Sequence, residues 1–117
     1  SEGLLGEFRS RWLVENPQGP RPRFFTKYVT DNPGEEEAVR VNAKSLSSLG
    51  VDAADMVQFH WWSLSQDGSL TTFLNAGRHL FGLKEQGKIR HLAGCNMDTT
   101  NLKLLVDDGM PIEANQV

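Results

Sequence analysis

The stretch Asp55–Trp62, which reads Asp-Met-Val-Gln-Phe-His-Trp-Trp, decides the fold class. Its apolar and aromatic residues run almost without interruption over a length typical of a β-strand, and they do not follow helical spacing. A strand of this kind is buried on both faces, which indicates a parallel sheet covered by helices. His60 lies near the carboxyl end of this strand. It is either a core histidine bonded to the backbone or a functional residue, and the pattern on either side of it bears on that choice.

Helices and strands alternate along the whole chain. Apolar residues recur at helical spacing in four segments, and β-branched and aromatic residues are common in the segments between them. Glycine and proline mark the boundaries, because both residues interrupt regular structure. The sequence predicts helices over Ser1–Glu15, from Asn32-Pro33 to Gly50, over Gly68–Gly87 and from Asp98 or Thr99 to Gly109, and strands over Arg23–Thr30, Asp55–Trp62, Lys88–Asn96 and Pro111–Val117.

Three local features refine the helices. The first helix carries an apolar face that includes Leu4 and Phe8. Asn32 can cap the second helix, with Pro33 at its first helical position. Gly77 falls in the middle of the third helix, where glycine costs on the order of 1 kcal/mol relative to alanine. We therefore expect close packing at Gly77 rather than a break.

The strict alternation favours an α/β fold with parallel strands joined by crossover helices. Lys27, His60 and Asn96 stand near the ends of successive strands, 33 and 36 positions apart. A unit of about 30 residues fits both a doubly wound sheet and a (β/α)8 TIM barrel. A barrel needs about 250 residues. Residues 1–117 would then form a single incomplete domain, close to half of such a barrel.

Composition argues against several classes of protein. The chain has 12 basic and 15 acidic residues with no block of one sign, so no clustered basic surface for nucleic acid is expected. No apolar run approaches the roughly 18 residues that span a bilayer. Cys95 is the only cysteine and cannot form an internal disulfide, which suits a reducing compartment and predicts a cytoplasmic protein.

Four polar side chains stand near the carboxyl ends of the predicted strands: Lys27, His60, Asn96 and Gln116. The carboxyl ends of parallel strands meet on one rim, where α/β proteins bind ligands and carry out chemistry. Each residue also has a simpler interpretation. Lys27 could snorkel from an edge strand, Asn96 could begin an Asx turn, and Gln116 could be a loop residue. Together, the four residues predict a functional site on this rim.

Other chemistry is less well supported by the sequence. No Gly-x-Gly-x-x-Gly sequence follows a strand, so the common dinucleotide-binding motif is missing. His79 and His91 are isolated and no metal-ligand spacing occurs, so no metal site is expected. Cys95 could be a nucleophile, but no basic partner is evident, and a small buried thiol is the simpler interpretation.

Several short stretches, weak singly but specific in combination, occur in order along essentially the whole chain. They include a Ser-Glu-x-x-Leu-Gly opening, a Phe-Thr-Lys strand, an Asp…His-Trp run and a Gly-Lys-Ile-Arg turn. In this combination they resemble the aldo-keto reductase family, from its second barrel helix to its sixth barrel strand. The matching stretches are Ser1–Gly6, Phe25–Lys27, Leu49–Asp52 with Asp55–Trp61, Gly87–Arg90 with Gly94–Asn96, and Asn115–Val117.

The resemblance implies a (β/α)8 barrel that reduces a small-molecule aldehyde or ketone with NADPH or NADH. In the family, a tyrosine protonates the carbonyl oxygen as hydride arrives from the nicotinamide. Lys27 would occupy the position of the lysine that lowers the pKa of this tyrosine. His60 would orient the substrate carbonyl and help to stabilise the developing oxyanion. Trp61 resembles the tryptophan of the substrate pocket.

The resemblance also implies cofactor contacts at the ends of the last two strands. Asn96 and Gln116 match the residues that hold the nicotinamide carboxamide, since amide side chains supply both donors and acceptors. Cys95 stands where the family usually has serine. One hydrogen bond to the cofactor would therefore be weaker or missing.

The family's tyrosine and its partner aspartate lie upstream of the position that matches Ser1, so these 117 residues alone are expected to be inactive. Tyr28 is the only tyrosine and follows Lys27 in the same strand, so it points to the opposite face and cannot replace the missing acid. Two alternatives are a nucleotide-binding regulatory protein and a structural protein, both without turnover. Without the resemblance, the sequence indicates only a parallel α/β binding domain. It does not define the substrate, the choice between NADPH and NADH, or the oligomeric state.

Overall fold

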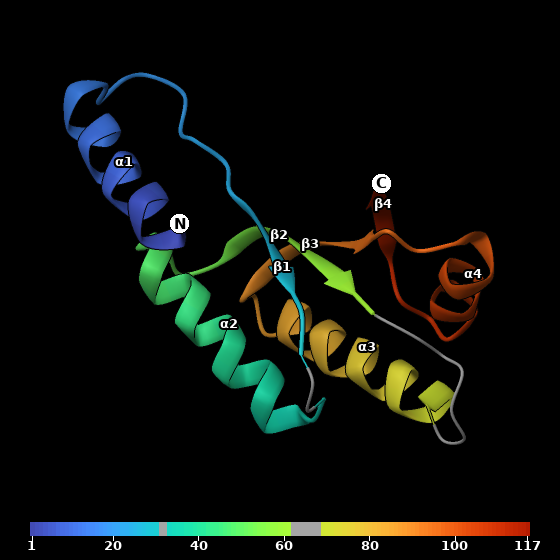
Figure 1. The fold of residues 1–117 in the computed structure, drawn as a ribbon. Helices are drawn as coiled ribbons and strands as arrows, with labels where there is room; N and C mark the ends of the chain where they lie inside the picture. The colour runs from blue at the N-terminus through green and yellow to red at the C-terminus, as the bar shows by residue number, and fades with distance from the viewer. Residues whose placement is uncertain (31–32, 62–68) are drawn as a thin grey trace.

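The computed structural model describes residues 1–30, 33–61 and 69–117. In these ranges four helices alternate with four strands, and the strands form one parallel sheet in the order β1-β2-β3-β4 (Figure 1). None of the helices in these ranges is long and apolar enough to cross a membrane. The elements are α1 (Glu2–Glu15), β1 (Phe25–Tyr28), α2 (Glu35–Leu49), β2 (Ala54–His60), α3 (Ser69–Glu85), β3 (Ile89–Cys95), α4 (Thr99–Asp107) and β4 (Ile112–Gln116).

The order of the strands decides between the two architectures that the spacing of the elements left open, of which the family resemblance implied the barrel. A doubly wound sheet reverses its strand order at a switch point, whereas a barrel adds each strand beside the previous one. The order here is sequential throughout. Right-handed crossovers between such strands put the helices on one face, and Figure 1 shows α2 and α3 along the same side of the sheet. The chain is therefore part of a (β/α)8 barrel, as predicted.

The core lies between the sheet and the helices α2 and α3. Tyr28, Phe59 and Leu92 point to this face from three neighbouring strands, and each is at most 2% exposed. Phe73 of α3 stacks on Phe59, with ring centroids 5.5 Å apart. Burial of a side chain of this size contributes on the order of 1.5–3 kcal/mol. The opposite face of the sheet is open, and Phe25 on that face is 57% exposed.

Several local predictions about the helices are confirmed. α2 ends at Gly50, whose φ of 68° lies in the left-handed region that favours glycine. Asp98 caps α4, because its side chain accepts a hydrogen bond of 2.7 Å from the N–H of Asn101. α3 continues through Gly77, where an added Cβ would lie 2.4 Å from the Sδ of Met110. The glycine thus marks a close contact, as the sequence predicts.

The predicted start of α2 is wrong by two residues. The helix begins at Glu35, with Gly34 in an extended conformation as its N-cap, so Pro33 precedes the helix. The predicted cap, Asn32, lies outside the described residues. Trp62, the last residue of the strand predicted around His60, also lies outside them.

The apolar face predicted for α1 is exposed in the structure. Leu4 is 71% exposed and Phe8 is 49% exposed, whereas Gly6 is the buried residue of this helix. An added Cβ at Gly6 would lie 2.2 Å from the carbonyl oxygen of Ser48, near the end of α2. The backbones of α1 and α2 therefore approach each other at the glycine. Among the described residues, no layer covers the apolar face of α1.

Gly6→Ala is expected to destabilise the protein by about 1–3 kcal/mol, because the new methyl group would meet helix backbone rather than a flexible side chain. Urea unfolding followed by circular dichroism measures the change. Gly3→Ala on the same helix is the matched control. No atom lies within 4 Å of a Cβ at Gly3, so the helix propensity of alanine should stabilise that variant by up to about 1 kcal/mol. Equal effects of the two substitutions would contradict the close approach at Gly6.

Candidate active site

The register of the sheet brings four of the predicted site residues to one face. Paired residues of neighbouring parallel strands point to the same side, and so do alternate residues along a strand. His60 pairs with Cys95, and Cys95 pairs with Gln116, so these three residues form one layer across β2, β3 and β4. Lys27 pairs with Gln58, two residues before His60. Lys27 therefore lies on the same face, one layer closer to the amino ends of the strands.

Lys27 and Tyr28 face opposite sides of the sheet, as predicted. Lys27 is exposed, whereas Tyr28 is 2% exposed and its ring centroid lies 6.0 Å from that of Phe59 in the core. Burial raises the pKa of the Tyr28 phenol, and the negative charge of Glu37 raises it further. A phenol with a raised pKa is a weaker acid. Tyr28 is therefore unsuited to donate a proton to a carbonyl group.

A groove of about 680 Å³ opens beside the edge strand β1. Its lining includes Lys27, Gln58 and Gln116, and therefore brings together side chains from three strands. His60 lies on the same face of the sheet as Lys27, but it is not among the described residues that line this groove. Gln58 is only 8% exposed and was not predicted as a site residue. The sequence contains a signal for Gln58, because it lies two residues before His60 and alternate residues of a strand share a face.

Glu2 joins the start of α1 to β1 and α2. Its Oε1 accepts one hydrogen bond from Thr26 Oγ1 and another of 3.1 Å from Ser45 Oγ. Thr26 directly precedes Lys27, so Glu2 fixes the strand next to the predicted catalytic lysine. The partners lie 24 and 43 positions from Glu2 in the chain, and no local pattern in the sequence indicates these contacts.

Trp61 packs at the helix side of the sheet end. Its ring centroid lies 5.9 Å from that of Phe59 and 5.6 Å from that of Phe73, both of which are fully buried. His60, directly before it, is partly buried, and its Nε2 atom lies inside the protein. These contacts hold one side of the Trp61 ring against the core. A role for Trp61 in a substrate pocket stays a prediction.

Asn96 occupies a tight turn directly after β3. Its φ of 52° lies in the left-handed region, which asparagine adopts more readily than most residues. Its N–H donates a hydrogen bond of 2.7 Å to the carbonyl oxygen of Gln116. The side chains of Asn96 and Gln116 therefore start from neighbouring points of the backbone. Together their amide groups offer donors and acceptors to one ligand.

The remaining candidates have structural surroundings. Cys95 is 3% exposed, so the prediction of a buried thiol is confirmed. His91 contacts the Oε2 of Glu113 on β4, at 2.6 Å. Within residues 1–30, 33–61 and 69–117, no three histidine, cysteine, aspartate or glutamate side chains come together in a way that could hold a metal ion.

The sequential parallel strands and the layer of polar side chains define part of a (β/α)8 barrel with a candidate site on its open face. The sequence model of the aldo/keto reductase family matches residues 1–117, and the chain belongs to this family. Among curated proteins, methylglyoxal reductase DkgA of Yersinia pestis is 36% identical to it over 74 residues. That match covers 62% of this chain and 25% of DkgA.

Solved structures show the same fold. MGS-M4, an aldo-keto reductase enzyme from a Medee basin deep-sea metagenome library, is 24% identical with a TM-score of 0.79, and the match covers 99% of this chain and 40% of that one. An aldo/keto reductase from Klebsiella pneumoniae, solved in complex with NADP and acetate, is 24% identical with a TM-score of 0.74. This match covers 99% of this chain and 38% of the Klebsiella chain. The chain thus spans about a quarter of the curated relative and about two fifths of these structures.

Ultraviolet titration of the phenol should show that Tyr28 ionises above its ordinary pKa of about 10. Tyr28 is the only tyrosine of residues 1–117, so in this 117-residue chain the absorbance change reports Tyr28 alone. In urea, the midpoint should return to about 10, because burial no longer disfavours the phenolate. The folded state then holds this proton more tightly than the unfolded state, so stability should fall as the pH rises above about 10. Tyr28→Phe should remove that fall. A native midpoint at or below the midpoint in urea would contradict the buried position.

Proposed function

We propose that the protein containing this chain is an oxidoreductase that reduces aldehydes or ketones to alcohols with NADPH or NADH. The observation that carries the proposal is the pairing that puts Lys27 and His60 on one face of adjacent parallel strands, with Cys95 and Gln116 continuing it. Family membership, the name methylglyoxal reductase of one relative, and the NADP in the Klebsiella structure support the carbonyl substrate and the cofactor. The buried free thiol of Cys95 fits a reducing compartment such as the cytoplasm. The proposal further includes a small-molecule substrate and no nucleic-acid or membrane partner.

The amide groups at the ends of β3 and β4 suit a nicotinamide. A carboxamide has an acceptor oxygen and an NH₂ donor, and Asn96 and Gln116 offer the complementary set. The hydrogen bond between their backbones brings the two residues side by side, which supports a shared contact with one planar group. When bound, the reduced nicotinamide supplies the hydride.

His60 and Lys27 have separate roles in this proposal. His60 donates a hydrogen bond to the carbonyl oxygen of the substrate and stabilises the negative charge that develops there. Lys27 lowers the pKa of a neighbouring tyrosine phenol, because its ammonium favours the phenolate. Tyr28 faces the core, so the proton donor is not among residues 1–117. We expect no turnover from these residues alone.

Lys27→Met and His60→Gln are each expected to lower kcat/KM for methylglyoxal on the order of 100-fold or more, because each removes an interaction used in the transition state. The measurement is NADPH consumption by the complete protein. Lys103→Met is the matched control. Lys103 lies on the exposed side of α4 in an ion pair with Asp107, so its loss should leave the rate unchanged. If the two rim variants kept the kinetics of the unaltered protein, the reductase proposal would be wrong.

Cys95→Ser is expected to tighten NADPH binding by up to about tenfold, because a hydroxyl is a stronger hydrogen-bonding group than a thiol. Cys95→Ala is the matched control for loss of the thiol and should bind NADPH no more tightly than the unaltered protein. Quenching of tryptophan fluorescence by NADPH measures both affinities. Unchanged NADPH affinity in both variants would show that the side chain at this position does not meet the cofactor, and weaker binding by the serine variant would contradict the expected gain of a hydrogen bond.

A further inference from the structure

β4 contains one residue more than the stretch of β3 beside it. Between the pair Leu92–Ile112 and the pair Gly94–Asn115, β3 advances by two residues and β4 by three. An extra residue on one strand is a β-bulge, and it reverses the alternation of side chains beyond it. With regular pairing, Asn115 would lie opposite Cys95 and would share its face. The bulge gives that place to the next residue and turns Asn115 to the other face.

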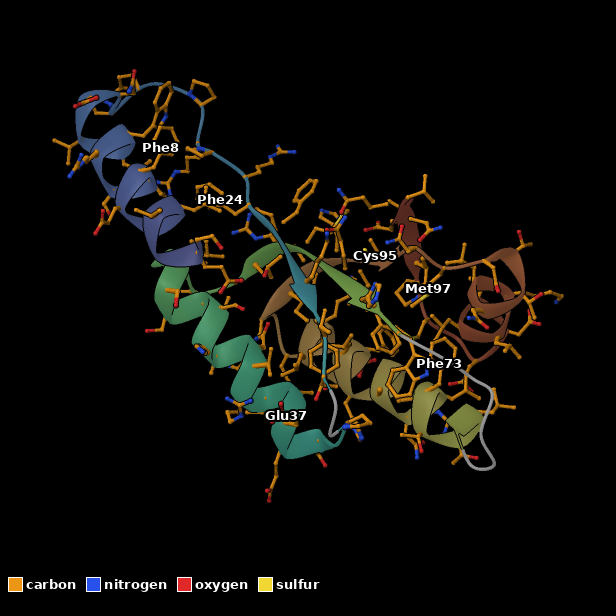
Figure 2. All side chains as sticks on the ribbon, viewed as in Figure 1. Phe8, Phe24, Glu37, Phe73, Cys95 and Met97 are labelled. Atoms are coloured by element: carbon orange, nitrogen blue, oxygen red, sulfur yellow. The ribbon has the colours of Figure 1, made fainter. Side chains whose placement is uncertain are left out.

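Asn115 uses this direction to hold the backbone of Met97. Its Nδ2 donates a hydrogen bond of 2.8 Å to the carbonyl oxygen of Met97, and its Oδ1 accepts one of 3.3 Å from the Met97 N–H. Gly94 makes room for this contact, since a Cβ there would lie 3.0 Å from Asn115 Oδ1 and 3.3 Å from Met97 Sδ. Met97 is 6% exposed, and Figure 2 shows it with Cys95 near β4 and α4. The residue is therefore held through both its backbone groups and its side chain.

Asn96 lies between two contacts with β4. Its own N–H is bonded to the carbonyl oxygen of Gln116, and the next residue is held by Asn115. A left-handed backbone is unfavourable for residues other than glycine, and it persists where neighbouring contacts determine it. Contacts with β4 therefore constrain the backbone at Asn96, whose φ is 52°, and at the next residue. The backbone conformation of a residue sets where its side chain starts, so these contacts bear on the direction of the Asn96 side chain.

We propose that Asn115 is a positioning residue for the nicotinamide carboxamide, which it does not itself contact. By holding Met97, Asn115 keeps Asn96 in its left-handed turn. The same bulge that turns Asn115 away from the open face turns Gln116 toward it. One extra residue in β4 thus orients both amides that would hold the carboxamide. This inference rests on the proposed function of the site.

The variant Asn115→Asp tests the proposal with little change of shape. An ionised carboxylate still accepts the N–H of Met97 but cannot donate to its carbonyl oxygen, and Asn115→Ala loses both bonds. In the complete protein, the affinity for NADP⁺ should fall about tenfold in the aspartate variant and at least as much in the alanine variant. The affinity for 2′-phospho-ADP-ribose, which is NADP⁺ without its nicotinamide, should be retained. Isothermal titration calorimetry measures both affinities. If the protein binds NAD⁺ instead of NADP⁺, the ligands to compare are NAD⁺ and ADP-ribose.

Asn16→Ala is the matched control. It removes a side-chain amide bond of 3.1 Å to the carbonyl oxygen of Trp12, at the end of α1 that leads into β1. Both affinities should be unchanged in this variant. Equal loss of both ligands in the Asn115 variants would show that Asn115 only supports the fold, and an unchanged affinity for NADP⁺ would show that Asn96 does not need it. If the unaltered protein binds neither ligand of either pair, the proposed function is itself wrong. If it binds both ligands of a pair equally tightly, the nicotinamide adds no affinity, and the inference alone is wrong.

Discussion

The register between β2 and its two neighbouring strands determines where Lys27, His60 and Cys95 lie. Parallel pairing aligns side chains in layers, and a shift of one residue would turn His60 toward the helices and Phe59 toward the open face. The core prevents that shift. Phe59 is fully buried between Tyr28 and Phe73, and its exposure would cost on the order of 1.5–3 kcal/mol. Aromatic packing on one face therefore holds the polar residues in place on the other.

The two faces of the sheet differ in chemistry because helices cover only one of them. The covered face is apolar across three strands, and the single tyrosine of the chain belongs to it. The other face carries Lys27, Gln58 and His60. This face becomes the interior when a (β/α)8 barrel is closed. A lysine and a tyrosine that are neighbours in the sequence thus have different surroundings. Lys27 stays exposed, and burial raises the pKa of Tyr28.

Departures from regular backbone geometry gather at the carboxyl ends of β3 and β4. The bulge in β4, the left-handed Asn96 and the close approach at Gly94 all lie within this small region. Bulges and unusual backbone conformations are common beside functional sites, because they turn a side chain in a direction that a regular strand does not allow. The regular sheet supplies a rigid support, and these few irregular residues set the directions of Asn96 and Gln116.

The sequence by itself determined the order of the elements, the parallel strands and the positions of Lys27, His60, Asn96 and Gln116 near their ends, because these features depend on local spacing. It also determined that Lys27 and Tyr28 face opposite sides. The spacing of the elements left a doubly wound sheet and a barrel open, and the family resemblance implied the barrel. The pairing of the strands in the tertiary structure confirmed it, since the choice depends on which strands pair. Only the tertiary structure decided the contacts of Glu2 with Thr26 and Ser45, the exposure of the apolar face of α1, and the bulge that turns Asn115 toward Met97. Each of these arises between segments far apart in the chain, and local patterns carry no information about such contacts.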